Sequence, residues 1–207
     1  MSAQDFVRAA RASDAAALAR VQVECWRRGY KGIIPDPVLA ELTSDEAGAQ
    51  WRERWAEAIV KPPTSRHRVL VAVAEPEPVD APDAPDAARE ESGPAGRPPR
   101  VIAGFASAGP ASDPDRWPAT DGELYELRVA PGFTGRGHAS RLLNAVADTL
   151  AEDRFTRVSA WVLEADEALR SFLESTGWAP DGARSELDMG VRVPILRLHA
   201  SLGPPPS

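Results

Sequence analysis

Apolar residues recur at helical spacing in the first part of the chain. Leu18, Val21 and Cys25 fall on one stripe, because steps of three and four residues bring side chains to the same side of a helix. Ser13 can cap this helix at its start, and the pattern stops near Gly29. The sequence therefore predicts an amphipathic first helix with one buried face.

A second helix is predicted by aromatic and aliphatic residues spaced four apart. Trp51, Trp55 and Ile59 occupy positions i, i+4 and i+8 of one helical stripe. The preceding segment 43–46, Thr-Ser-Asp-Glu, has the spacing of a capping box, in which a hydroxyl and a carboxylate satisfy the first backbone N–H groups. Two helices are therefore expected before the first long strand.

The rest of the chain alternates strand patterns with helix patterns. Strand spacing occurs in 68–75, 100–108, 123–129 and 157–163, and two weaker strands are expected at about 185–190 and 193–199. The first two predict an antiparallel hairpin. A helical stretch, 138–150, separates 123–129 from 157–163, so we expect these two strands to be parallel and joined by a right-handed crossover.

The last predicted helix and the fold class follow from this order. A short helix is expected to begin at Asp166, to bury Leu169, Phe172 and Leu173, and to end before Gly177, which would take the C′ position. The elements together predict an α/β (α+β) fold. We expect a single domain over residues 1–207, with a mixed central sheet of about six to seven strands flanked by about four helices.

One stretch departs from the pattern. Residues 75–100 contain seven prolines and carry seven acidic against three basic side chains. Such a composition buries too little apolar surface to offset the entropy of ordering. We therefore predict that residues 76–99 are a disordered Pro/Ala/acidic loop inserted in the hairpin, and that residues 201–207 are a tail.

Charge and composition exclude several classes of protein. The formal net charge of −7 argues against nucleic acid as a partner, because phosphate binding needs clustered cations. No stretch is long and apolar enough for a membrane span, and the polar start does not resemble a signal peptide, so a cytoplasmic location is expected. Cys25 is the one cysteine, and a single cysteine is more typical of a small core residue than of a reactive thiol. His67 and His199 have no partners at metal-binding spacing, so no metal site is expected.

A glycine-rich loop is the strongest chemical signal. Residues 132–143, GFTGRGHASRLL, lie where a predicted strand ends and a helix begins. Backbone N–H groups at a helix start bind anions, and glycines let a phosphate approach them. A nucleoside-triphosphate loop would need Lys and Ser/Thr after Gly137 but finds His138 and Ala139, and a dinucleotide fingerprint would need Gly or Ala where Ser140 stands. A pyrophosphate is the expected ligand, and a tight turn without a ligand is the alternative.

Two segments resemble a known family. ELYELRVAPGFTGRGHASRLL resembles the acyl-CoA signature of the GNAT superfamily of N-acyltransferases, Gln/Arg-x-x-Gly-x-Gly/Ala; here Gly137 and Ala139 match, and Thr134 stands at the first position. Segment 160–182 resembles the family's second element, a strand followed by a short helix and Gly-Phe. Segment 25–36 is similar to the first-helix region of many bacterial members, which borders the acceptor site.

The resemblance implies the ligands and the residues that bind them. Acetyl-CoA (coenzyme A) would be the co-substrate, without a metal, and His138 would lie near phosphate or solvent rather than act as a base. The strand N–H groups of 127–129 would donate to the thioester oxygen. Trp26, Tyr30 and Tyr125 would border the acceptor. The cofactor-binding residues implied in this way are Leu127, Arg128, Val129, Thr134, Gly135, Arg136, Gly137, His138, Ala139, Asp166 and Phe172.

The catalytic residues are also implied by the resemblance. Glu123 lies eleven residues before Thr134, the spacing at which many members place a glutamate base, and Glu126 is the next candidate. A solvated acid at the end of a strand is the alternative for Glu123. The tyrosine that frequently serves as the acid is replaced by Leu173, so the thiolate would leave unaided or take a proton from water.

These inferences imply an enzyme. The chain would be an N-acetyltransferase that moves an acetyl (acyl) group from acetyl-CoA to a primary amine of a small molecule or peptide by direct attack in a ternary complex. The alternative is a catalytically degenerate acyl-CoA-binding sensor or scaffold, which Thr134, Leu173 and Asp166, the last at a position where the family has Asn, would suit. An acidic surface favours cationic acceptors such as polyamines, aminoglycosides or lysine-bearing peptides. Neither nucleic acid nor membrane is expected as a partner, and a homodimer is left open.

Overall fold

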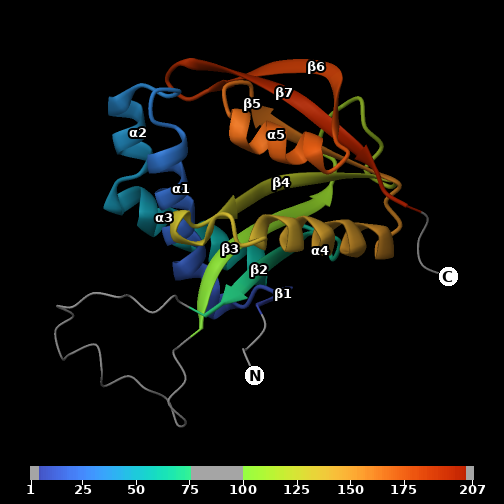
Figure 1. The fold of residues 1–207 in the computed structure, drawn as a ribbon, viewed down its shortest axis with the longest axis horizontal. Coiled ribbons are helices and arrows are strands. Elements are labelled where there is room, and N and C mark those ends of the chain that lie inside the picture. The colour runs from blue at the N-terminus through green and yellow to red at the C-terminus, as the bar shows by residue number, and fades with distance from the viewer. Residues whose placement is uncertain (1–4, 76–99, 204–207) are drawn as a thin grey trace, which may run out of the picture.

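A seven-stranded mixed sheet forms the centre of the protein, which we describe from a computed structural model (Figure 1). The structure describes residues 5–75 and 100–203. The strand order is β1-β2-β3-β4-β5-β7-β6. The strands are β1 (Phe6–Ala9), β2 (Arg68–Ala74), β3 (Val101–Pro110), β4 (Asp121–Val129), β5 (Arg157–Leu163), β6 (Ala179–Asp188) and β7 (Arg192–Ser201).

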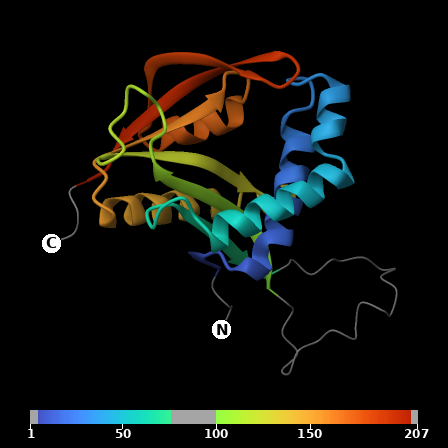
Figure 2. The ribbon, with the colours of Figure 1, turned by 180° about the vertical axis from the view of Figure 1, so that it is seen from behind.

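Helices cover both faces of the sheet, as the two opposite views show (Figures 1 and 2). Helices α4 and α5 pack on one face of the sheet, and α1 and α3 pack on the other. Each pair shares a separate apolar cluster with the strands. The α-helices are α1 (Ala15–Gly29), α2 (Asp36–Leu42), α3 (Asp45–Val60), α4 (His138–Glu152) and α5 (Glu167–Ser175), and the 3₁₀ turns are η1 (Ala12–Asp14) and η3 (Pro131–Phe133).

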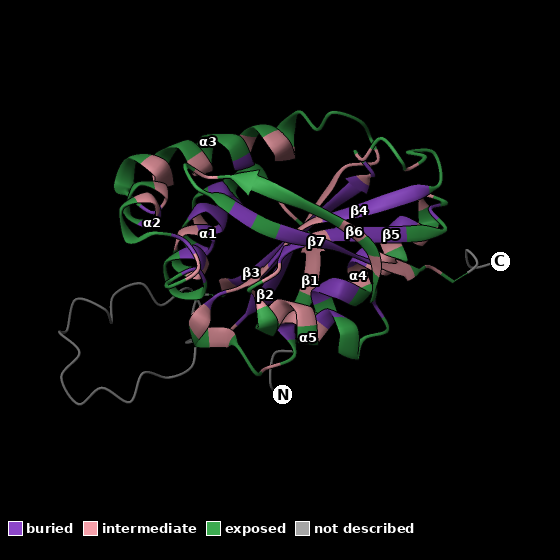
Figure 3. Cartoon of the chain, turned by 90° about the horizontal axis from the view of Figure 1, so that it is seen from above, coloured by how far each residue is buried: buried purple, intermediate pink, exposed green. Residues whose placement is uncertain are grey.

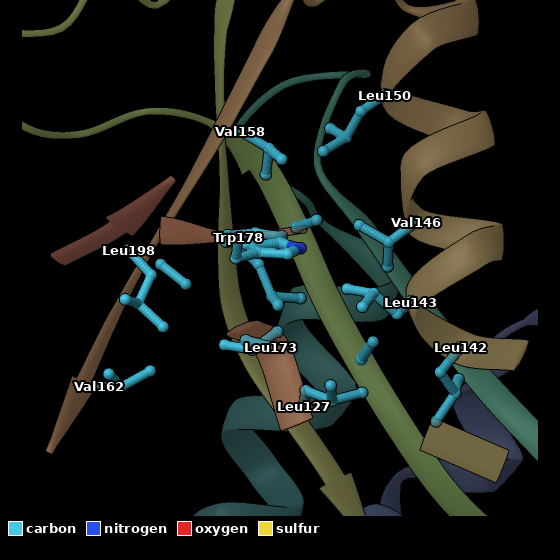
Figure 4. Packing of buried hydrophobic residues seen from close by; sticks show 14 of the residues in the cluster. Leu127, Leu142, Leu143, Val146, Leu150, Val158, Val162, Leu173, Trp178 and Leu198 are labelled. Atoms are coloured by element: carbon cyan, nitrogen blue, oxygen red, sulfur yellow. The ribbon is translucent and has the colours of Figure 1, made fainter. Parts of the chain in front are cut away.

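The apolar alternation of the strands builds the two layers of the core. Leu70 and Ala72 of β2 join the cluster under α4, whereas Val71 and Val73 point to α1 and α3. The inner strands are buried and β6 is largely exposed (Figure 3). Under α4 and α5 the cluster includes Leu142, Leu143, Val146 and Leu150 of α4, Leu173 of α5, and Trp178 (Figure 4).

The parallel strands β4 and β5 diverge, and this divergence positions the site. They pair over three residues of β4, Asp121 to Glu123, although β4 continues to Val129 and β5 to Leu163. On its other edge β4 pairs with β3 throughout, with an irregularity where Ser107 faces Glu126 and Ala108 faces Leu124. The extra residue, Tyr125, is typical of a β-bulge, which bends the strand. The second half of β4 therefore has no strand partner on the β5 side.

Most predicted elements are present in the structure. The hairpin of β2 and β3, the parallel crossover through α4, and the last two antiparallel strands are confirmed. Asp166 caps α5 by accepting a hydrogen bond from Leu169 N at 3.0 Å, and Gly177 follows the helix with φ +92°, as predicted for the C′ position. The predicted disordered loop at 76–99 lies outside the described residues.

Two predicted helix caps were wrong. Ser13 does not cap α1; the chain enters the helix through η1, where Asp14 accepts a hydrogen bond from Arg11 N at 2.7 Å and pairs with Arg8. Ser44, not Thr43, caps α3 and accepts a hydrogen bond from Ala47 N at 3.1 Å. Both predictions placed the cap one residue early, because neighbouring hydroxyl and carboxylate side chains are equally suited to capping.

Two elements were missed, and one strand was predicted too short. β1 has four residues and α2 has seven, so neither offers two full periods of a pattern. β6 begins at Ala179, whereas the predicted strand began at about 185. The early part was missed because Pro180 and Gly182 interrupt the strand pattern in the sequence. Among the described helices, none combines the length and the apolar character that crossing a membrane requires.

Candidate active site

A groove opens where β4 turns away from β5. Two adjoining cavities of about 450 and about 560 Å³ share Val129, Thr134, Ala139, Ala168 and Phe172 as lining residues. One extends to α1 along Leu127 and Arg128, and the other extends over the glycine-rich loop to the start of α4. The two together form a path from a helix N-terminus to the unpaired half of β4, a size and shape typical of a small-molecule site.

The glycine-rich loop ends in a backbone conformation that only glycine adopts readily. Gly135 and Gly137 have φ of +75° and +76°, and Gly137 is the N-cap of α4. A Cβ at Gly135 would meet no atom within 4 Å, so the space beside the loop is open. The first N–H groups of a helix have no partner inside it, and the start of the fifteen-residue α4 lies at the cavity that Gly137 and His138 line, which suits an anionic group such as a pyrophosphate.

The structure brings together ten of the eleven residues that the resemblance assigned to the cofactor. Leu127, Arg128 and Asp166 line the cavity toward α1, and Gly135, Gly137 and His138 line the cavity at α4; Val129, Thr134, Ala139 and Phe172 line both. Arg136 lines neither cavity in the described part of the chain. Its guanidinium lies 5.1 Å from the centre of the Phe133 ring and reaches toward the Glu75 carbonyl.

His138 is buried at the start of α4, not in solvent, with 1% of its surface exposed. Its Nε2 lies 3.7 Å from the Asp5 carboxylate, and its ring packs edge-on against Phe133. Burial lowers the pKa of His138 below its ordinary value, although the Asp5 carboxylate opposes that shift. The imidazole thus packs against the first turn of α4 beside the loop.

Arg128 occupies the centre of a polar group between β4 and α1. Its Nη2 donates a hydrogen bond to the Tyr30 hydroxyl at 2.6 Å and lies 3.0 Å from Glu126 Oε2. Burial raises the pKa of Tyr30 to about 12, although the Arg128 charge opposes the shift. Burial lowers the pKa of Arg128, but Glu126, Tyr30, Cys25 and Asp166 together more than offset this effect, so the pKa of Arg128 is raised above its ordinary value. Glu126, the second candidate base, is therefore held in an ion pair.

Glu123 is buried at the last paired position of β4. It is 7% exposed, and its Oε2 accepts hydrogen bonds from the backbone N and from Oγ of Ser112, both at 2.9 Å. Ser159 of β5 lies directly opposite in the parallel register. The carboxylate is thus fixed at the point where the strands separate, four residues before Leu127. The alternative of a solvated acid at the end of the strand does not fit this burial.

The three aromatic residues expected at the acceptor do not lie together. Trp26 and Tyr30 are buried in a cluster with residues of α2 and β7, and their ring centres are 5.6 Å apart. Tyr125 lies elsewhere: its hydroxyl donates to the Pro110 carbonyl at 2.6 Å, and its ring stacks on His67. None of the three lines the groove among the described residues. An acceptor role for them stays a prediction.

Sequence reasoning expected segment 25–36 to border the acceptor site but did not single out the three residues of α1 that line the cavity. Cys25, Arg28 and Gly29 line the cavity, and Cys25 Sγ donates to the Val129 carbonyl at 3.2 Å. Cys25 and Gly29 are four residues apart on a helix, so their shared face could have been recognised, but nothing local indicates that this face meets β4. Among the described residues, no three or more His, Cys, Asp and Glu side chains gather as a metal site.

Leu173, which stands at the usual tyrosine position, is fully buried in the core and does not face the groove. Its neighbour Phe172 lines both cavities. The described structure therefore gives α5 no proton donor at position 173, and a tyrosine placed there would enter the packed cluster of Figure 4.

We expect Leu173→Tyr to destabilise the protein by about 1–3 kcal/mol, because a larger side chain with a hydroxyl must fit a closely packed core. Urea unfolding measures the change. Phe172→Tyr is the matched control: it adds a hydroxyl at the groove wall and should leave stability nearly unchanged. Faster acetyl transfer by Leu173→Tyr, without loss of stability, would contradict the orientation of α5 described here.

Comparisons with known proteins agree with the fold and the groove. The model of the Acetyltransferase (GNAT) family matches residues 46–178. An uncharacterized N-acetyltransferase, YuaI of Bacillus subtilis (strain 168), is 27% identical over 163 residues, which cover 79% of this chain and 74% of the relative.

Solved structures of low sequence identity share the fold. PaiA N-acetyltransferase from Thermoplasma acidophilum, in complex with coenzyme A, has a TM-score of 0.60 and 15% identity, with 94% of this chain and 98% of that chain covered. YncA from Salmonella typhimurium, with its cofactor acetyl-CoA, has a TM-score of 0.59 and 18% identity over 99% and 98% of the two chains.

Fold and groove together define an α/β acyltransferase class, in which parallel strands part beside a glycine-rich loop. The family match covers more than half of the chain. The protein belongs to the GNAT family of acetyltransferases.

Proposed function

We propose that this protein is an N-acetyltransferase that transfers the acetyl group of acetyl-CoA to a primary amine of a small molecule or peptide. The observation that carries the proposal is the continuous groove from the αL glycines of the loop to the unpaired half of β4. In this proposal the pyrophosphate of acetyl-CoA lies on the N–H groups of residues 134–139, and the pantetheine arm runs between β4 and α5.

The chain supplies groups for attack on the thioester. Glu123, fixed by Ser112, takes a proton from the amine directly or through water. The amine nitrogen then attacks the carbonyl carbon, and a backbone N–H of residues 127–129 stabilises the oxyanion, because this half of β4 has no β5 partner. Both reactants are bound together, so the acetyl group passes directly to the amine.

The acceptor class is proposed to be cationic. The chain carries a net charge of −7, which raises the local concentration of amines such as polyamines, aminoglycosides and lysine-bearing peptides. The proposal is tested by incubating the protein with acetyl-CoA and a panel of these amines, and by measuring both released thiol and acetylated product by mass spectrometry. CoA binding without transfer to any amine of a broad panel would instead support the acyl-CoA sensor, which the buried Leu173 would suit.

A further inference from the structure

We propose that the guanidinium of Arg128 binds the sulfur of the departing CoA thiolate and so replaces the acid that Leu173 cannot supply. The inference rests on the proposed function, because it requires CoA in the groove. It assigns to Arg128 a catalytic contact with the leaving group, which is different from a structural ion pair.

The position of Arg128 is the first support. It lines the cavity at the unpaired half of β4, between Leu127 and Val129, and only 13% of its side chain is exposed. A buried cation interacts more strongly with a nearby anion than a solvated one, because little water screens the pair. Charge that develops on sulfur in this cavity therefore meets a cation already in place.

The hydrogen bonds of Arg128 leave a donor available. Nη2 contacts the Tyr30 hydroxyl and Glu126 Oε2, which hold the side chain in one orientation. Nε is buried without a hydrogen-bond partner among the described residues and has no surface open to the cavity. Nη1 is not one of these fully buried atoms, and it makes no hydrogen bond or ion pair to another described residue. Nη1 is therefore the donor that a thiolate in the cavity can reach.

A sulfur already present on the cavity wall reports on the local field. Cys25 Sγ lies in the same cavity and donates to the carbonyl of Val129, the residue after Arg128. Burial raises the pKa of this thiol to about 11. The Arg128 charge lowers the pKa and is the largest effect after burial. Glu24 and Glu126 raise the pKa, each by less than Arg128 lowers it. The other charged or titratable groups that act on Arg128 are Tyr30 and Asp166. Arg128 thus favours the anionic form of a sulfur at this wall, although burial outweighs this effect at Cys25.

The step balances without a proton donor. The protonated amine first loses one proton to Glu123, directly or through water. The lone pair of the neutral amine forms the C–N bond, and the nitrogen then loses its second proton to water. When the tetrahedral intermediate collapses, the C–S bond breaks and its electron pair stays on sulfur. Arg128 remains protonated throughout, since a guanidinium does not deprotonate in proteins, and the thiolate takes a proton from water after release.

The test measures the thiol pKa of bound CoA. All proteins carry Cys25→Ser, because Cys25 is the one cysteine in the sequence and CoA then supplies the only thiol. CoA saturated with protein is titrated across neutral and alkaline pH while the ultraviolet absorbance of the thiolate is recorded. The Cys25→Ser protein should lower the thiol pKa by about one unit or more relative to free CoA, a tenfold preference for the thiolate.

Variants at Arg128 identify the source of the shift. Arg128→Gln should return the thiol pKa to that of free CoA or above it, because the cavity then desolvates the anion without a cation, and Arg128→Lys should restore part of the shift. Arg20→Gln, which removes an exposed arginine of α1 outside the groove, is the matched control and should change nothing.

The outcomes separate this inference from the proposed function. CoA that binds the Cys25→Ser protein with a thiol pKa at or above that of free CoA would overturn the role of Arg128, whether or not the Arg128 variants fold. An equal shift in Arg128→Gln would overturn it too. No binding of CoA at all would overturn the proposed function, and this inference with it.

Discussion

We expect Gly137→Glu to abolish CoA binding. The new side chain would begin at the N-cap of α4, where it would enter the anion site, and its carboxylate would repel a pyrophosphate from the same N–H groups. The left-handed backbone at φ +76° adds a strain of about 1–3 kcal/mol for any residue with a Cβ. Isothermal titration calorimetry with CoA measures the loss.

Two control variants separate charge from strain. Gly137→Ala has the same backbone strain without the charge; its Cβ would meet only the flexible end of Arg141 at 3.8 Å, so part of the affinity should remain. Gly132→Glu adds the same charge in the same loop, at a position that does not line the described cavities, and should bind CoA nearly as well as the wild type. Equal CoA affinity of Gly137→Glu and wild type would mean that the phosphates bind elsewhere.

Features that depend on neighbours in sequence could be predicted. The start of α4 after the glycine-rich loop, the cap at Asp166 and the end of α5 at Gly177 each involve residues within about one helical turn, so a short motif carries the geometry. The parallel pairing of β4 and β5 followed from a helix between two strands. The sequence therefore predicted the position of the glycine-rich loop between β4 and α4.

Contacts across long sequence distances could not be predicted. The Arg128–Tyr30 hydrogen bond joins residues 98 apart, and the Cys25–Val129 bond joins residues 104 apart. No motif encodes them, because they arise when α1 packs on the second half of β4. Tyr125 is another such case: it lies at the β-bulge of β4, and its ring stacks on His67, a contact that alternation along the strand does not indicate.

The partner of Glu123 illustrates an intermediate case. Ser112 lies only eleven residues away, but most of the connection between β3 and β4 lies between them, and its course determines the contact. The spacing to Thr134 indicated Glu123 as a candidate base, whereas its fixation by a serine hydroxyl and a backbone N–H is visible only in the structure. Spacing therefore suggests the candidate, and packing decides its environment.

Glu123→Gln should lower turnover by about 10²-fold or more near neutral pH, the usual contribution of a positioned general base. CoA affinity should stay nearly unchanged, because Glu123 lines neither of the two described cavities. The amide has the shape of the carboxylate and can still accept from Ser112, so the fold should be retained. Steady-state kinetics with acetyl-CoA and an accepted amine would therefore show the loss in kcat, with little change in the KM for acetyl-CoA.

The pH dependence gives the sharper test of this role. A primary amine with a pKa of about 10.4 is mostly protonated at neutral pH, and a base is needed to remove its proton. As pH rises, more of the amine arrives already deprotonated, so the deficit of Glu123→Gln should shrink. Glu126→Gln is the matched comparison, since that carboxylate is paired with Arg128. If Glu123→Gln keeps wild-type turnover from neutral to alkaline pH while Glu126→Gln loses much of it, Glu126 is the base. If both variants keep wild-type turnover, no carboxylate base is needed, because water or an acceptor that binds as the free amine serves instead.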